Sequence, residues 1–213
     1  MNFILIFKNS AKELKSVRCL TTTGFLCALY IVLTAYVPQT EVLRISFGYL
    51  ALAIIGMLFG PVVAVLAAVP CDIIVGIISP FPFNPLFIPS RMLEGLIYGI
   101  FLYGYGSRGT DNSKSGAVWA AWQVMRIVIS RFLVAVFCYF ILNSFAIFVL
   151  SLPPGRAQEI LATQSFWVWA FARTGIKTIA QFPVDFALMF TLLPAVNIAY
   201  IKTLQSFGKE RKS

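Results

Sequence analysis

The chain has 213 residues, of which 59% are hydrophobic and 12% charged, and its mean hydropathy is +0.85. Soluble domains are about half apolar and a quarter charged, so this composition excludes an ordinary soluble fold and indicates an integral membrane protein. The formal charge of +9 is spread over short basic clusters between apolar runs, which argues against nucleic-acid binding. Because the sequence has no His and no CxxC pair, we expect neither a metal nor a redox cofactor.

The first segment is apolar and is followed by Lys8, Lys12 and Lys15. This order is the reverse of a signal peptide, so residues 1–17 are predicted to form an amphipathic leader on the cytoplasmic face of the membrane. We expect a single transmembrane domain over residues 1–213, in which 18–200 form the helical bundle and 201–213 a basic cytoplasmic tail.

An α-helix needs about 20 apolar residues to cross the hydrocarbon core of a bilayer. The apolar stretch 48–79 is too long for one crossing, and Gly60-Pro61 pairs a helix stop with a residue favoured at a helix start, so we divide it there. The predicted fold is all-α with six transmembrane helices, at 18–37, 48–59, 62–79, 91–107, 122–150 and 166–200. Six crossings place both termini on one side, and the basic loops on that side predict that it is cytoplasmic.

Three segments then face outward, at 38–47, 79–90 and 151–165. The middle one contains Pro80, Pro82, Pro85 and Pro89, whose fixed φ angles suit a stiff flap. A solvated connector is the alternative, although its phenylalanines would be poorly placed in water.

Five charged residues lie inside apolar stretches: Asp72, Glu94, Arg131, Arg173 and Lys177. Ions cost at least about 2.5 kcal/mol in hydrocarbon, so such residues usually face a polar cavity inside a bundle. At 1.5 Å per residue, Asp72, Glu94 and Arg173 lie about 6–10 Å from the outer ends of three helices. We therefore expect one charged layer lining an outward-facing pocket.

Other residues join this layer by helical spacing. Lys177 follows Arg173 by one turn, Arg91 and Tyr98 flank Glu94 on one stripe, and Trp169 precedes Arg173 by one turn. The Trp169 indole suits either stacking on a flat ring or the interfacial aromatic belt. A carboxylate accepts two donors side by side, and an Arg presents the converse fork.

Two alternatives stay open at this point. Asp72 or Glu94 could pair with Arg173 or Lys177 for structure alone. The sequence likewise leaves open whether Arg126, Arg131 and Asp185 have a purely structural role.

The predicted first helix carries a small-xxx-small pair, Gly24 and Ala28, which lets another helix approach closely, either within the chain or from a partner subunit. There is no GxxxxGK[ST] motif, so the chain does not bind ATP as a P-loop protein.

Several segments resemble the substrate-binding S component of energy-coupling factor (ECF) vitamin transporters, specifically the folate family: SVRCLTTTGFLCALYIVLTAYV, LRISFGYLALAIIGMLFGP, EGLIYG and FARTGIKTIAQFPVD. The likeness covers most of residues 16–195. It implies a non-enzymatic, multi-pass protein of the plasma membrane that binds its vitamin from outside. It also implies docking through Gly24 and Ala28 onto a transmembrane coupling subunit, with two ATPase subunits supplying energy.

For the ligand, the resemblance implies that the pterin ring of folate lies in the layer of Asp72, Glu94 and Arg173. Arg44 and Phe47 of the first outer loop, with Phe83 of the flap, would cap it. Arg44, Arg91 or Arg173 would steer the anionic glutamate tail. The alternatives are an S component for another flat vitamin such as riboflavin or thiamin, a membrane enzyme, which would need clustered acids that this chain lacks, and a purely structural membrane partner.

Overall fold

The computed structural model describes residues 3–35, 47–79, 84–104, 116–152 and 155–210, and within them every regular element is helical. The first group of helices consists of α1 (Phe3–Glu13), α2 (Val17–Ala35), α3 (Gly48–Phe59), α4 (Pro61–Ile78) and α5 (Phe87–Leu102). The second group is formed by α6 (Gly116–Leu133), η1 (Val134–Asn143), α7 (Ser144–Ala146), η2 (Ile147–Ser151), α8 (Arg156–Thr163), α9 (Phe166–Ala170), η3 (Phe171–Gly175) and α10 (Ile176–Glu210), where η denotes a π-helical segment.

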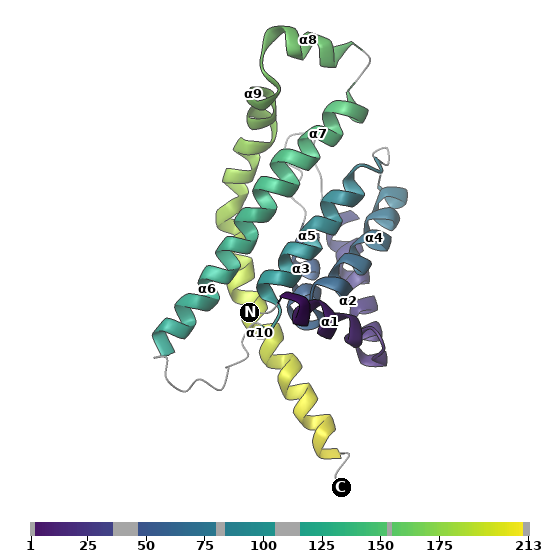
Figure 1. Cartoon of the computed structure of the whole chain (residues 1–213), viewed down its shortest axis with the longest axis vertical. Helices are drawn as coiled ribbons and strands as arrows, with labels where there is room; N and C mark the ends of the chain where they lie inside the picture. The colour runs from purple at the N-terminus through teal and green to yellow at the C-terminus, as the bar shows by residue number, and fades with distance from the viewer. Residues whose placement is uncertain (1–2, 36–46, 80–83, 105–115, 153–154, 211–213) are drawn as a thin grey trace.

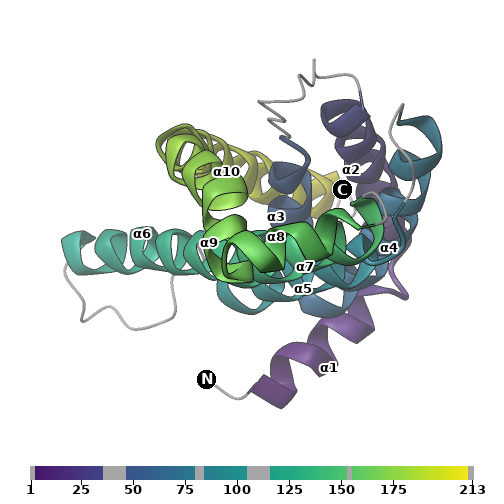
Figure 2. The same ribbon diagram turned by 90° about the horizontal axis from the view of Figure 1, so that it is seen from above.

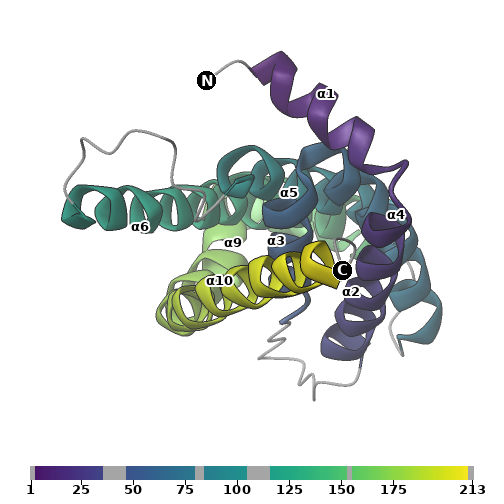
Figure 3. The ribbon, with the colours of Figure 1, turned by 90° about the horizontal axis from the view of Figure 1, so that it is seen from below.

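The helices form two long columns beside a compact group (Figure 1). One column runs from α6 through η1 and α7 to η2, and the other runs from α9 through η3 to α10, with α8 crossing at their upper end. Helices α2 to α5 pack together beside both columns, with α5 against α6 and η1 and with α3 against α10. Viewed from above and from below, α1 projects from this group and α2 lies at its rim (Figures 2 and 3).

Four described segments are long and apolar enough to cross a membrane: Val17–Ala35, Pro61–Ile78, Ala121–Val149 and Gln181–Thr203. They correspond to four of the six predicted crossings. The other two predicted crossings are helices here as well, but α3 has 12 residues and α5 has 16, which is short of a full hydrocarbon span. All-helical architecture is therefore confirmed, whereas six crossings and cytoplasmic termini remain predictions.

Helix boundaries differ from the predicted ones mainly at the ends of α5 and α10. Helix α5 begins at Phe87 and ends at Leu102, four or five residues earlier than predicted, and α10 continues to Glu210. Two carbonyls at that end, those of Phe101 in the last turn and of Tyr103 just after the helix, accept hydrogen bonds from Arg126 of α6 at 2.6 and 2.7 Å. A guanidinium favours such a position because a helix C-terminus presents unpaired carbonyls and partial negative charge.

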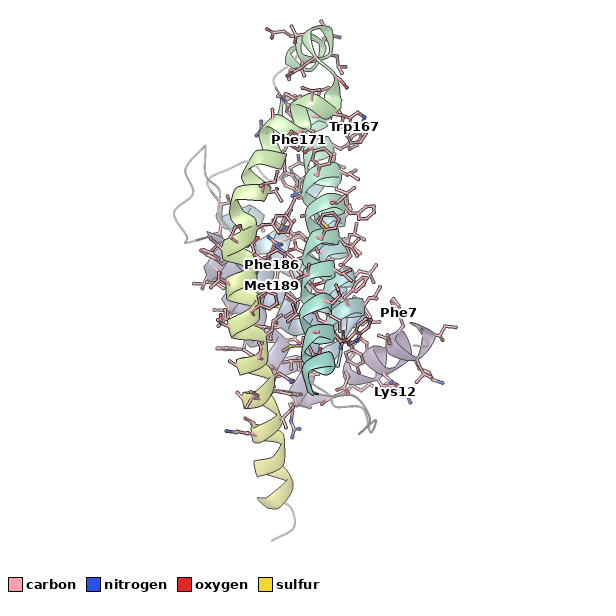
Figure 4. All side chains as sticks on the ribbon, turned by 90° about the vertical axis from the view of Figure 1, so that its left-hand side faces the viewer. Phe7, Lys12, Trp167, Phe171, Phe186 and Met189 are labelled. Atoms are coloured by element: carbon pink, nitrogen blue, oxygen red, sulfur yellow. The ribbon has the colours of Figure 1, made fainter. Side chains whose placement is uncertain are left out.

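The predicted break at Gly60-Pro61 is present, and α1 closes it. Gly60 has φ +86°, a conformation that glycine adopts readily, and Pro61 begins α4. The buried Ser10 hydroxyl donates to the Phe59 carbonyl at 2.7 Å and accepts from the Val62 amide at 3.0 Å. The amphipathic helix α1 is thus fixed to the α3–α4 junction, and it lies across the direction of the columns, with Phe7 above it and Lys12 below it in the view of Figure 4.

Three glycines allow α3, α4 and α5 to pack at short range. A Cβ on Gly56 would lie 2.8 Å from the Gly99 nitrogen, and one on Gly95 would lie 2.9 Å from the Ala64 carbonyl oxygen. A Cβ on Gly99 would lie 2.5 Å from the Pro61 nitrogen. Such small-residue contacts bring helix backbones together where apolar burial alone gives little driving force. They hold the amino-terminal half of α4 against the carboxyl-terminal half of α5, and because the two helices run antiparallel, the other half of α4 lies beside the start of α5.

Helix α10 contacts α6 and α3. Phe186 and Met189 lie between the two columns, and Met189 is fully buried (Figure 4). At the upper end of the same columns Trp167 and Phe171 are exposed, as expected for an aromatic belt at a membrane interface (Figure 4).

Candidate functional site

A chain of polar side chains runs through the bundle between α4, α5, the α6–η1 column and α10. We call it the central polar network and define it by seven residues: Asp72, Arg91, Glu94, Tyr98, Arg131, Tyr139 and Asp185. Asp72 lies six residues before the end of α4 and Arg91 four residues after the start of α5, so both lie about 6–9 Å from the same end of the bundle.

The first part of the network is built around Arg91. Its Nη1 donates to Glu94 Oε2 at 2.7 Å, and its Nε lies 3.5 Å from Asp72 Oδ1. Glu94 is completely buried, and its other oxygen, Oε1, accepts a hydrogen bond from the Tyr139 hydroxyl at 3.0 Å. Asp72 retains 12% exposure of its side chain. One arginine therefore bridges a closed carboxylate and a more open one.

The second part is built around Arg131, which is 2% exposed. Its guanidinium forms an ion pair with Asp185, with Nε 3.0 Å from Oδ2, and Nη1 donates to the Tyr98 hydroxyl at 3.0 Å. The same group lies over the ring of Tyr49, 4.2 Å from its centroid. Removing this arginine from water is costly. The ion pair with Asp185, the hydrogen bond to Tyr98 and the stacked ring of Tyr49 compensate for that cost.

Tyr139 joins the two parts. Its hydroxyl donates to Glu94 and accepts from Arg131 Nη1 at 3.3 Å, so acids and bases from four elements form one connected network. Tyr139 belongs to η1, where π-helical geometry alters the order in which side chains face a neighbouring helix. Short π-helical segments are often found at functional positions. A 3.6-residue period does not predict which way the side chains of such a segment face.

The structure joins Asp72 and Glu94, and the basic residue described between them is Arg91. Arg173 is exposed on η3, and its described contact is with the Trp169 ring, 5.7 Å from the centroid. The spacing of Trp169 and Arg173 along one face is therefore correct, whereas the expected place of Arg173 in the buried layer is not. The π turn Phe171–Gly175 accounts for this, because it shifts the helix phase at this residue.

Other predicted residues are placed as follows. Tyr98 is buried within the network, and Phe47, which directly precedes α3, is half-buried against the core. Arg44 and Phe83 lie outside the described residues, and Lys177 is described only in its α10 backbone. Gly24 and Ala28 are both exposed on α2, and a Cβ on Gly24 would meet nothing within 4 Å.

Sequence reasoning left the roles of Arg131 and Asp185 open and did not single out Tyr49 or Tyr139. A charge inside an apolar helix was the available signal for Arg131 and Asp185, since each needs a partner at similar depth. Tyrosines carry no such signal. Among the described residues no cluster of three or more His, Cys, Asp or Glu could hold a metal ion.

The described fold is a helical membrane bundle in which a buried network of charged and aromatic groups runs from near one end into the middle, which is the architecture of a membrane protein that handles a polar small molecule. The model of the family described as "ECF-type riboflavin transporter, S component" matches residues 14–181. The chain therefore belongs to this family of membrane-embedded transporter subunits, which is not a family of enzymes.

Two similar proteins refine this picture. The chain is 34% identical over 92 residues to "Folate transporter FolT" of Clostridium novyi (strain NT), a match that covers 42% of this chain and 54% of that protein. The match thus spans about half the length of the curated relative. A solved structure, "Crystal structure of FolT bound with folic acid", matches with a TM-score of 0.61 at 22% identity, over 84% of this chain and 95% of that one, and supports the fold.

Proposed function

We propose that this chain is the substrate-specific S component of an ATP-driven ECF uptake transporter and that it binds folate from outside the cell. The observation that carries the choice of folate is the 34% identity to a folate transporter over 92 residues. The resemblance of the sequence segments to the folate family of S components points the same way.

The chemistry of the central polar network suits a pterin ring. One edge of this ring presents the 2-amino group and N3–H, two neighbouring donors that a carboxylate accepts side by side. Asp72 and Glu94 supply carboxylates at one end of the bundle, and Arg91 lies between them. Tyrosine rings beside them offer flat apolar surfaces for the heterocycle. The ring would lie over these groups.

Riboflavin is the second candidate because the matching family model is named for it. Its isoalloxazine ring presents one N–H between two carbonyl oxygens. A carboxylate facing that edge would accept one hydrogen bond and be repelled by the flanking oxygens, so the acids of the network favour the pterin.

The choice between the two vitamins is tested by titrating the purified protein in detergent with folate and with riboflavin, using calorimetry. We expect saturable binding of folate and riboflavin binding at least about 100-fold weaker. Tighter binding of riboflavin than of folate would transfer the proposal to riboflavin. Binding of neither would overturn the assignment of a flat vitamin.

The remaining ligand contacts are also proposals. Arg91 would steer the anionic glutamate tail, as would Arg44 or Arg173, since guanidinium groups bind carboxylates in a fork geometry. Further ring contacts are proposed for the other residues predicted from the sequence, namely Tyr98, Trp169, Phe47, Phe83 and Lys177.

The proposed topology has six crossings with both termini in the cytoplasm of the cell and the network near the outer face of the plasma membrane. Helix α1 supports this orientation, because its exposed basic residues suit an anionic cytoplasmic leaflet and its junction with Gly60-Pro61 lies at the end opposite Asp72. Labelling of single introduced cysteines at residues 156 and 208 in intact cells would test it. We expect labelling at 156 alone.

The proposed partners are a transmembrane coupling subunit and two ATPase subunits. Gly24 and Ala28 lie on an exposed face of α2, at the rim of the bundle, so a second helix could approach there without steric conflict (Figures 2 and 3). Uptake of labelled folate into cells should require co-expression of the coupling subunit and ATPases, whereas binding alone should not.

A further inference from the structure

We infer that the two acids of the network have different roles: Asp72 is the residue that accepts the donor edge of the ligand, and Glu94 is a positioning residue. This inference rests on the proposed function. It resolves a choice that the sequence leaves open, because both acids lie at suitable depth on neighbouring helices.

Both oxygens of Glu94 already have a donor, and neither is open to a ligand. It is fully buried, Oε2 accepts from Arg91 at 2.7 Å, and Oε1 accepts from Tyr139 at 3.0 Å. Because Glu94 is enclosed, a ring edge could reach it only by displacing Arg91 or Tyr139, and the Tyr139 hydroxyl would then lose its acceptor inside the bundle. Such a loss is unfavourable because a buried polar group without a partner is costly.

Asp72 is in the opposite situation. Its described contact is the ion pair with Arg91 Nε at 3.5 Å, which is longer than a good hydrogen bond, and its side chain is 12% exposed. Two neighbouring N–H donors could replace that contact with two short, charge-assisted hydrogen bonds. The acid that is easier to reach is thus also the one that is less engaged by neighbouring donors.

Arg91 makes the division of roles workable. It contacts the two acids through different nitrogens, Nε toward Asp72 and Nη1 toward Glu94. A ligand can therefore take Asp72 while Arg91 stays bound to Glu94. Glu94, held by Tyr139 from η1, fixes the guanidinium beside the ring, and this is what we mean by a positioning role.

The test is a double-mutant cycle between each acid and the 2-amino group of the ligand. Affinities for folate and for 2-desaminofolate are measured by calorimetry on the wild-type protein and on the variants Asp72→Asn and Glu94→Gln. Glu159→Gln is the matched control, because Glu159 is an exposed acid on α8, outside the network.

We expect Asp72→Asn to weaken folate binding at least about 30-fold and to weaken 2-desaminofolate binding much less, because folate loses two charge-assisted bonds and 2-desaminofolate, which keeps only N3–H, loses one. Glu94→Gln should weaken binding of both compounds by the same factor. Glu159→Gln should change neither. Selective loss of folate with Glu94→Gln, or equal factors with Asp72→Asn, would overturn the inference.

Two further measurements keep the outcome clear. Asp72→Glu retains the charge and the Arg91 pair but moves the carboxylate by one methylene, so it should also reduce the preference for folate over 2-desaminofolate. An unchanged preference would contradict our assignment. This variant gives a result even if Asp72→Asn does not fold. If the wild-type protein binds folate but the acid variants do not discriminate between folate and 2-desaminofolate as expected, the assignment of roles to Asp72 and Glu94 is wrong and the proposed function stands. If the wild-type protein does not bind folate, the proposed function itself fails.

Discussion

Replacing Gly99 by alanine tests whether the close packing of α4 on α5 supports the network. The added Cβ would lie 2.5 Å from the Pro61 nitrogen and 2.8 Å from the Pro61 Cβ, whereas ordinary contacts begin at 3.4 Å. The start of α4 would have to move by about 1 Å, and overpacking of this kind costs about 1–3 kcal/mol. Alanine recovers up to about 1 kcal/mol through its higher helix propensity. Because the overlap is with the backbone of Pro61, which cannot move aside as a flexible side chain can, the upper part of that range applies and a net loss of about 1–2 kcal/mol is expected.

Thermal unfolding in detergent, followed by circular dichroism, measures this loss. For a chain of this size 1 kcal/mol corresponds to about 2–4 °C, so the midpoint should fall by about 2–8 °C. Folate binding should weaken as well, because Tyr98, the neighbour of Gly99, accepts a hydrogen bond from Arg131. Gly24→Ala is the control, since a Cβ there meets nothing within 4 Å, and its midpoint should stay level or rise. Equal midpoints for Gly99→Ala and the wild-type protein would refute the packing argument.

Three more predictions follow from single contacts. Ser10→Ala should lower stability by about 1–3 kcal/mol, seen as an earlier thermal midpoint, because the Phe59 carbonyl loses its buried donor; an unchanged midpoint would mean that α1 is not anchored there. Asp185→Asn should lower the free energy of unfolding by about 3–5 kcal/mol, because it leaves Arg131 charged without its carboxylate partner. The double variant with Arg131→Met should lose less than the sum of the two single losses, and additive losses would contradict the pairing. Gly24→Leu should leave folate affinity intact and prevent co-purification with the coupling subunit, whereas normal assembly would exclude this face as the docking site.

The local features of the fold could be predicted from the sequence. Apolar run length predicts the long helices, Gly60-Pro61 predicts the break between α3 and α4, and the basic residues after a short apolar segment predict the amphipathic helix α1. The spacing of Trp169 and Arg173 likewise predicts that they share one face of the helix, and the two side chains are in contact there. These features depend on local backbone stereochemistry and on the free energy of transferring side chains from water into the bilayer. Both are determined by residues that are close together in the sequence.

The partners of the charged residues could not be predicted this way. Depth along each helix placed Asp72, Glu94 and Arg173 in one layer, but it does not give the direction in which a side chain points. Arg91 occupies the position between the two acids because α4 and α5 pack closely there, and Arg173 lies outside because η3 shifts the phase of its helix.

By itself, the sequence determined that this chain enters a membrane as helices and that it carries charges where lipid would not tolerate them, because composition and run length decide transfer into the bilayer. Only the tertiary structure decided which charge neutralises which. Glu94 is closed by Arg91 and Tyr139 while Asp72 keeps an open side, since contacts among residues 72, 94 and 139 depend on how α4, α5 and η1 pack.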